Sequence, residues 1–189
     1  MSEQEQSIEE VRKRFIESKL WVFGYGSLMW NPGFHYAYKT LARSHGYHRD
    51  FAMRSVRHRG TPDLPGLVLT LCPGGSCVGR AFKIPPKDAM RVYDYLIERE
   101  ISTYAYKPAL IKIVVDSYSV AALTFVPKLG AAEFTPGKSL DQQAEIIAHA
   151  HGGMGTNRDY LTNTNEQLKA LGLTNKRFQA LEQKVLSLG

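Results

Sequence analysis

The sequence predicts one α+β domain, on three observations. In the first segment apolar residues recur at the spacing of a helix, and the centre of the chain consists of short apolar runs separated by glycine and proline. In the last quarter the helical spacing of apolar residues returns. Hydrophobic residues make up 43% and charged residues 22% of the 189 positions, which is typical of a globular protein and not of a disordered or fibrous one. No repeat or linker-like stretch divides the chain, so we expect one core with about six strands and four or five helices.

Residues 1–19 are predicted to form an N-terminal helical extension. Apolar residues recur at helical spacing up to Phe15, and Ser7 with Glu10 has the pattern of a capping box. The stretch is polar and charged and has none of the apolar core of a signal peptide. The single domain itself is expected over residues 20–189.

Short apolar runs predict the strands, and capping patterns predict the remaining helices. We expect strands at residues 21–25, one or two within 36–56, and at 67–71, 78–84, 109–115 and 120–126. The Gly-rich stretch 72–77 predicts a hairpin between the third and fourth of these runs. Helices are expected after Pro85-Pro86, after Ser139 with its capping partner Gln142, over 157–171, and around Phe178, Leu181 and Val185.

The net charge of +6 is concentrated between residues 43 and 60. Such a cluster fits nucleic acid, a membrane surface or a small anionic substrate, and equally a solvated strand face. Its members are Arg43, Arg49, Arg54, Arg57 and Arg59, interleaved with His45, His48 and His58. No run approaches 18 apolar residues, and two cysteines make no disulfide framework, so we expect a protein of the reducing cytoplasm.

Two short segments are candidates for chemistry. Residues 24–28 read Gly-Tyr-Gly-Ser-Leu at the end of a strand, where glycines let the backbone approach a ligand and amide groups bind an anion. Met29 stands where a dinucleotide fingerprint needs its third glycine, and an ordinary turn is the alternative. The second segment is the end of a predicted helix, Glu98-Arg99-Glu100. A carboxylate there meets the negative end of the helix dipole, which is unfavourable and therefore suggests a function for Glu100. The alternative is that both acids are solvated and Arg99 compensates their charge.

Metal and nucleophile sites have weak support. The pairs His45/His48 and His149/His151 lack two further ligands at zinc-site spacing. Ser27 is not in a nucleophile elbow, and the cysteines have no neighbouring base in the sequence. We therefore expect no metal and no cofactor.

Five blocks, ordered and spaced alike, resemble the ChaC family of γ-glutamylcyclotransferases from about residue 20 to the C-terminus. They are residues 21–34, 46–51, 58–62 with Pro65-Gly66 after it, 95–100 and 155–161. One departure lies directly after Glu100, where Ile-Ser-Thr-Tyr replaces a Lys-Gly-Gly-Tyr-like stretch of many relatives. This change leaves the substrate preference open.

The resemblance implies a small mixed β-barrel surrounded by helices and cleavage of glutathione into 5-oxoproline and cysteinylglycine. It implies Glu100 as the base, and a substrate-binding set of Gly24, Tyr25, Gly26, Ser27, Leu28, Met29 and Tyr160. The substrate's own amine is the nucleophile, so neither a metal nor a cofactor is implied. The implied partner is a small molecule, and neither nucleic acid nor membrane is expected as a partner. The alternatives are other γ-glutamyl amino acids or amines as substrates and, more remotely, a basic nucleic-acid-binding module; the oligomeric state stays open.

Overall fold

The computed structural model describes residues 3–101 and 105–189, which form two compact units. The first unit combines Met1–Arg49 with Leu71–Ala131, and the second combines Asp50–Thr70 with Ala132–Gly189. Two long strands, β2 (Tyr38–Ser55) and β3 (Gly66–Lys83), each contribute residues to both units.

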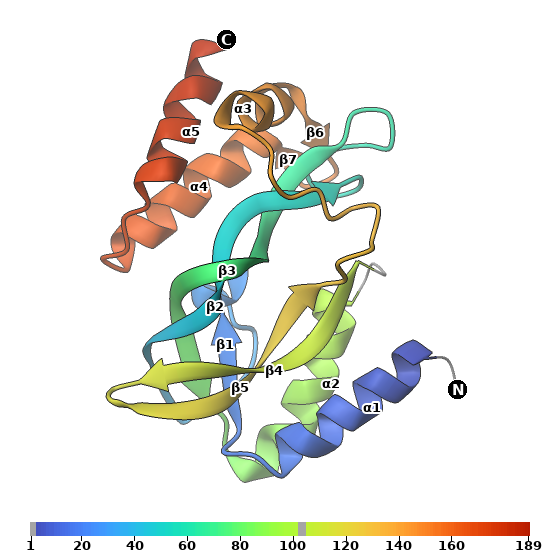
Figure 1. The fold of residues 1–189 in the computed structure, drawn as a ribbon, viewed down its shortest axis with the longest axis vertical. Helices are drawn as coiled ribbons and strands as arrows, with labels where there is room; N and C mark the ends of the chain where they lie inside the picture. Colours follow the sequence, from blue (N-terminus) through green and yellow to red (C-terminus); the bar gives the residue numbers. More distant parts are fainter. Residues whose placement is uncertain (1–2, 102–104) are drawn as a thin grey trace. The chain divides into compact units, whose positions relative to one another are not determined.

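Five strands form a closed mixed barrel in the order β1-β3-β2-β4-β5, which confirms the expected fold (Figure 1). β1 (Trp21–Gly24) pairs antiparallel with β3 and parallel with β5 (Tyr118–Pro127). β4 (Tyr106–Val115) forms an antiparallel hairpin with β5 and pairs with β2 on its other side.

β1 is buried on both faces, which explains why its sequence is a continuous apolar run. Successive side chains of a strand point to opposite faces. Val22 accordingly belongs to one core cluster, together with side chains of helices α1 and α2, whereas Trp21 and Phe23 belong to a second cluster formed by the barrel strands. This double burial fixes the end of β1, from which the candidate loop begins.

Helices α1 (Glu3–Ile16) and α2 (Ala89–Glu100) lie beside the barrel strands of the first unit (Figure 1). The predicted N-terminal helix is present, and Phe15 is fully buried in the core cluster that also contains Leu96 of α2. The predicted capping box was wrong, because α1 begins at Glu3 and Ser7 lies within it. A short 3-10 turn, η2 (Pro86–Asp88), precedes α2 as the prolines predict.

The predicted hairpin around residues 72–77 was wrong, because β3 continues through this stretch as one strand. Gly74 and Gly75 do adopt the positive φ angles, +91° and +74°, that such a turn requires. His48 of β2, however, lies with Nδ1 2.9 Å from the carbonyl oxygen of Gly74, so the strand keeps its neighbour across the glycines. The two glycines therefore distort the strand without reversing the chain.

Three helices and a two-stranded sheet make up the C-terminal part of the second unit (Figure 1). They are α3 (Leu140–His149), β6 (His151–Gly152), β7 (Gly155–Thr156), α4 (Asn157–Ala170) and α5 (Lys176–Ser187). The capping box of Ser139 and Gln142 is confirmed at the start of α3. Phe51 and Phe178 pack edge to face with their ring centroids 5.0 Å apart. None of the helices in the described ranges has the length and apolarity needed to cross a membrane.

Asn157 is the buried polar link between α4 and β3. Its side chain is fully buried and accepts a hydrogen bond from Leu67 N–H at 2.6 Å while donating one to the Leu67 carbonyl at 2.7 Å. We expect Asn157→Ala to lower the free energy of unfolding by about 2–4 kcal/mol, because two bonds are lost and a buried N–H and C=O stay unpaired. Urea unfolding measures the change. The exposed Asn163→Ala on the same helix should stay within about 0.5 kcal/mol of wild type; equal effects of the two variants would contradict this role.

Candidate active site

The glycine-rich segment forms a tight loop between β1 and a 3-10 helix, η1 (Ser27–Met29). At Gly24 the backbone lies so close to η1 that a Cβ atom there would lie 2.9 Å from Leu28 Cβ and 3.2 Å from the Leu28 carbonyl carbon. Glycine is thus needed at this position for packing of the loop against itself. Tyr25 anchors the loop by donating its hydroxyl to the Phe125 carbonyl at 3.0 Å.

Arginine side chains bind the carbonyl groups of this loop. Arg49 donates Nε to the Tyr25 carbonyl, and Arg80 donates Nη1 to the Met29 carbonyl at 2.7 Å. Because the carbonyls face guanidinium groups, the loop carries a concentration of positive charge around a backbone turn. No side chain caps η1 within the part of the chain that the structure describes, so the amides at its start keep donor capacity for a ligand.

Glu100 is the last residue of α2, as predicted, and its side chain is 25% exposed. Burial raises the pKa of its carboxyl group above the ordinary value of a glutamate, against the opposing effect of Arg99, whose Nε lies 3.1 Å from Glu100 Oε1. Glu98, by contrast, is exposed to solvent. The alternative of solvated acids therefore describes Glu98 and not Glu100.

Arg99 brings the two predicted parts of the site together. Its guanidinium contacts Glu100 on one side and donates Nη2 to Ser27 Oγ at 3.1 Å on the other. The helix end and the glycine loop are therefore joined through one side chain, across the 72 residues that separate Ser27 from Arg99 in the sequence. A half-buried carboxylate beside a loop with available amides is an arrangement suited to acid–base chemistry on a small polar molecule.

Arg49, Arg80 and Arg99 are the site residues that the sequence interpretation missed. Apart from their places in the blocks 46–51 and 95–100, Arg49 was visible as one member of the basic cluster and Arg99 as a compensating charge. Within that cluster Arg54 and Arg57 are exposed, whereas Arg49 binds the loop. The local sequence does not distinguish these two kinds of arginine.

Tyr160 lies in α4 of the second unit, where it is half-buried. Its hydroxyl accepts a long hydrogen bond from Leu69 N–H at 3.4 Å, and the Arg59 guanidinium lies over its ring, 5.4 Å from the centroid. Its role in substrate binding stays a prediction. The departure from the family pattern at residues 102–104 lies outside the described residues.

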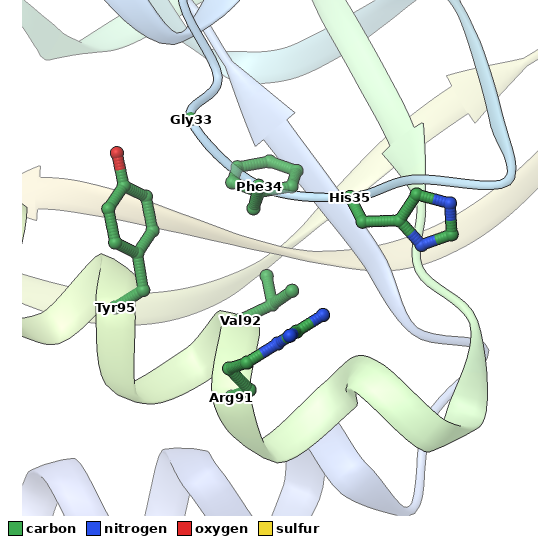
Figure 2. Close-up of a pocket in the computed structure, with 6 residues that line it drawn as sticks. All are labelled: Gly33, Phe34, His35, Arg91, Val92 and Tyr95. Carbon is green, nitrogen blue, oxygen red and sulfur yellow. The ribbon is translucent and has the colours of Figure 1, made fainter.

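A pocket of about 470 Å³ opens between α2 and the loop after η1 (Figure 2). Phe34 and Val92 give it an apolar floor, and His35 and Arg91 lie at its rim, each 2.8 Å from a carboxylate oxygen of Asp88. Its lining consists of Gly33, Phe34, His35, Arg91, Val92 and Tyr95. Neither Glu100 nor the loop 24–29 lines it, but Tyr95 on its wall is a hydrogen-bond partner of Arg99.

Groups that could hold a metal or act as a nucleophile are not assembled in the described ranges. Three or more His, Cys, Asp or Glu side chains do not gather at one point there. Cys77 is buried, and burial raises the pKa of its thiol, so a smaller fraction is present as the nucleophilic thiolate. That the reaction needs no metal or cofactor stays a prediction.

Comparisons with known proteins identify the family of the chain. A family model described as ChaC-like protein matches residues 20–188. The glutathione-specific γ-glutamylcyclotransferase of Schizosaccharomyces pombe is 38% identical over 184 residues, which cover 88% of this chain and 91% of that protein. The Escherichia coli protein of the same name is 34% identical over 158 residues, which cover 83% of this chain and 68% of that protein. The crystal structure of the yeast γ-glutamylcyclotransferase specific to glutathione superimposes with a TM-score of 0.79 at 25% identity, covering 90% of this chain and 96% of that one. The chain belongs to the family of ChaC-like proteins.

Proposed function

We propose that this protein cleaves the γ-glutamyl bond of glutathione to give 5-oxoproline and cysteinylglycine, with Glu100 as the base. The observation that carries the proposal is the pairing of a half-buried carboxylate of raised pKa with the glycine loop through Arg99. The relatives in Schizosaccharomyces pombe and Escherichia coli, whose names specify glutathione, support the choice of substrate.

The reaction is an intramolecular acyl transfer. Glu100 removes a proton from the substrate's α-ammonium group, and the resulting amine attacks the γ-carbonyl carbon of the same glutamyl residue. A five-membered lactam forms as the bond from that carbon to the cysteine nitrogen breaks. The two protons that the attacking nitrogen loses, the one held by Glu100 included, pass to the departing nitrogen, which leaves as the ammonium group of cysteinylglycine. Because nucleophile and electrophile belong to one molecule, the enzyme's main task is to hold the glutamyl chain folded back on itself.

The loop 24–29 suits the anionic parts of this substrate. Amides at the start of η1 can donate to the glutamyl carboxylate or to the oxyanion that forms on the γ-carbonyl, since donors aimed at developing charge are a large source of catalysis. The arginines that bind the loop carbonyls hold these donors in place before substrate arrives. We further infer a cytoplasmic location, because Cys72 and Cys77 are both thiols and glutathione is abundant in a reducing compartment.

The test is to incubate the purified protein with glutathione, γ-Glu-Ala and γ-glutamyl-lysine and to assay 5-oxoproline. We expect turnover of glutathione that is insensitive to a chelator. Turnover of only the other two compounds would identify a γ-glutamylcyclotransferase of different specificity. Activity that is lost with EDTA and restored by zinc would contradict the mechanism.

A further inference from the structure

We propose that Arg99 is a positioning residue that holds the base and the substrate-binding loop in one catalytic arrangement. This inference rests on the proposed function, because it takes Glu100 as the base. The Arg99 side chain is 21% exposed, and its three nitrogens are all engaged. Its partners are Glu100 Oε1, Ser27 Oγ, the carbonyl oxygens of Asn31 and Pro32, and the Tyr95 hydroxyl, at distances between 2.8 and 3.1 Å.

These contacts differ from those expected of a basic residue at a helix end. Such a residue commonly bonds the last carbonyls of its own helix and interacts with the dipole. Arg99 instead directs Nη1 and Nη2 out of α2 to the segment 27–32 and keeps Nε on the neighbouring carboxylate. Only a planar guanidinium offers donors in this forked arrangement, and a lysine ammonium would reach one side or the other.

The packing around Arg99 fixes the position of its side chain. Tyr95 lies one turn earlier on α2, and its hydroxyl accepts a hydrogen bond from Arg99 Nη1 at 3.0 Å. Gly33, with φ of +74°, brings the loop backbone so close that a Cβ there would lie 2.0 Å from the same hydroxyl oxygen and 3.4 Å from Arg99 Nη1. The guanidinium therefore lies between α2 and the loop backbone, and a side chain at position 33 would have no room beside it.

The position of the guanidinium also bears on the charge of the base. Burial favours the protonated form of Glu100, and the Arg99 cation favours the ionised form that can accept a proton. Arg99 is the charged group of the described residues that acts on this carboxyl, since Glu98 on the same helix end faces solvent. Removing the cation should therefore raise the pKa of Glu100 further and move the acidic limb of kcat/KM to higher pH.

The experiment compares kcat, KM and the pH profile of glutathione turnover for Arg99→Met and Arg99→Lys. We expect Arg99→Met to lower kcat about 10- to 100-fold, the scale of a misplaced catalytic group, and to move the acidic limb upward. Arg99→Lys should keep the limb near its wild-type position, because it keeps the charge, and should still lose about tenfold in kcat, because it loses the fork. Arg91→Met is the matched control; its guanidinium is on the same helix, exposed and paired with Asp88, and its kinetics should equal wild type.

Two results would overturn the proposal: wild-type kcat in Arg99→Lys, or an acidic limb that does not move in a folded Arg99→Met. If Arg99→Met fails to fold, the kinetics of Tyr95→Phe and Arg99→Lys test the proposal in its place. Tyr95→Phe removes one partner of Nη1 and should lower kcat modestly with the limb unmoved; unchanged kcat in both variants counts against positioning. Glu100→Gln, measured in parallel, separates this question from the choice of base: if it keeps wild-type activity, the assignment of Glu100 itself is wrong.

Discussion

Glu100→Gln is expected to lower kcat for glutathione by at least about 10²–10⁴, the usual contribution of a positioned general base. Glutamine is nearly isosteric with glutamate and still forms hydrogen bonds with the substrate, but it cannot accept the ammonium proton. KM should change little, because glutamine keeps these hydrogen bonds and the loop 24–29 is proposed to bind the glutamyl group. Initial rates of 5-oxoproline formation over a range of glutathione concentrations measure both constants.

The raised pKa of Glu100 explains how a carboxylate can serve as this base. An ordinary glutamate, with a pKa of about 4.3, is a poor acceptor for an α-ammonium proton with a pKa of about 8, and the gap of nearly four units corresponds to about 5 kcal/mol. Burial raises the pKa of Glu100 and so narrows the gap. The charge of Arg99 opposes this rise in pKa and favours the ionised form that can accept a proton.

The same shift fixes the sign of the effect on stability. A glutamate whose pKa is higher in the folded than in the unfolded state favours folding below its unfolded pKa, and this contribution is lost as the pH rises through the folded pKa. Above the folded pKa the ionised Glu100 therefore costs stability, and Glu100→Gln should there leave the melting temperature unchanged or slightly higher. The control is Glu98→Gln at the neighbouring exposed position, which should be nearly neutral in kcat and in stability. Loss of activity in Glu98→Gln but not in Glu100→Gln would mean that the other acid is the base.

Local patterns predicted the parts of the fold whose cause is local. The apolar run at Trp21 marks a strand buried on both faces, and Ser139 with Gln142 marks the start of α3, because the capping bonds are made within four residues. The position of Glu100 at the end of α2 could be predicted in the same way. The roles proposed for the loop and for Glu100 came from the resemblance and not from these patterns.

The features that could not be predicted depend on contacts between distant segments. Gly74 and Gly75 have the composition of a hairpin turn, yet β3 continues because β2 lies beside it. The roles of Arg49 and Arg99 follow from which carbonyl groups the fold brings to their guanidinium groups. The local sequence around an arginine is the same whether its side chain binds a loop or faces solvent. A division of the chain into units that each combine two separate segments is likewise invisible to composition.

Gly24→Ala is expected to lower kcat/KM for glutathione by about 10²-fold, chiefly through a higher KM, because it displaces the loop that is proposed to bind the glutamyl group. The new Cβ would lie 2.9 Å from Leu28 Cβ and 3.2 Å from the Leu28 carbonyl carbon, so η1 must move as a unit, and with it the amides that donate to the substrate. Leu28 is buried and cannot rotate out into solvent to relieve the contact. Gly130→Ala is the matched control, since a Cβ at Gly130 meets no atom within 4 Å and its φ is not positive, and its kinetics should equal wild type. Steady-state rates and thermal melting of both variants give the comparison; wild-type KM in a folded Gly24→Ala would show that the loop is a turn without a part in binding substrate.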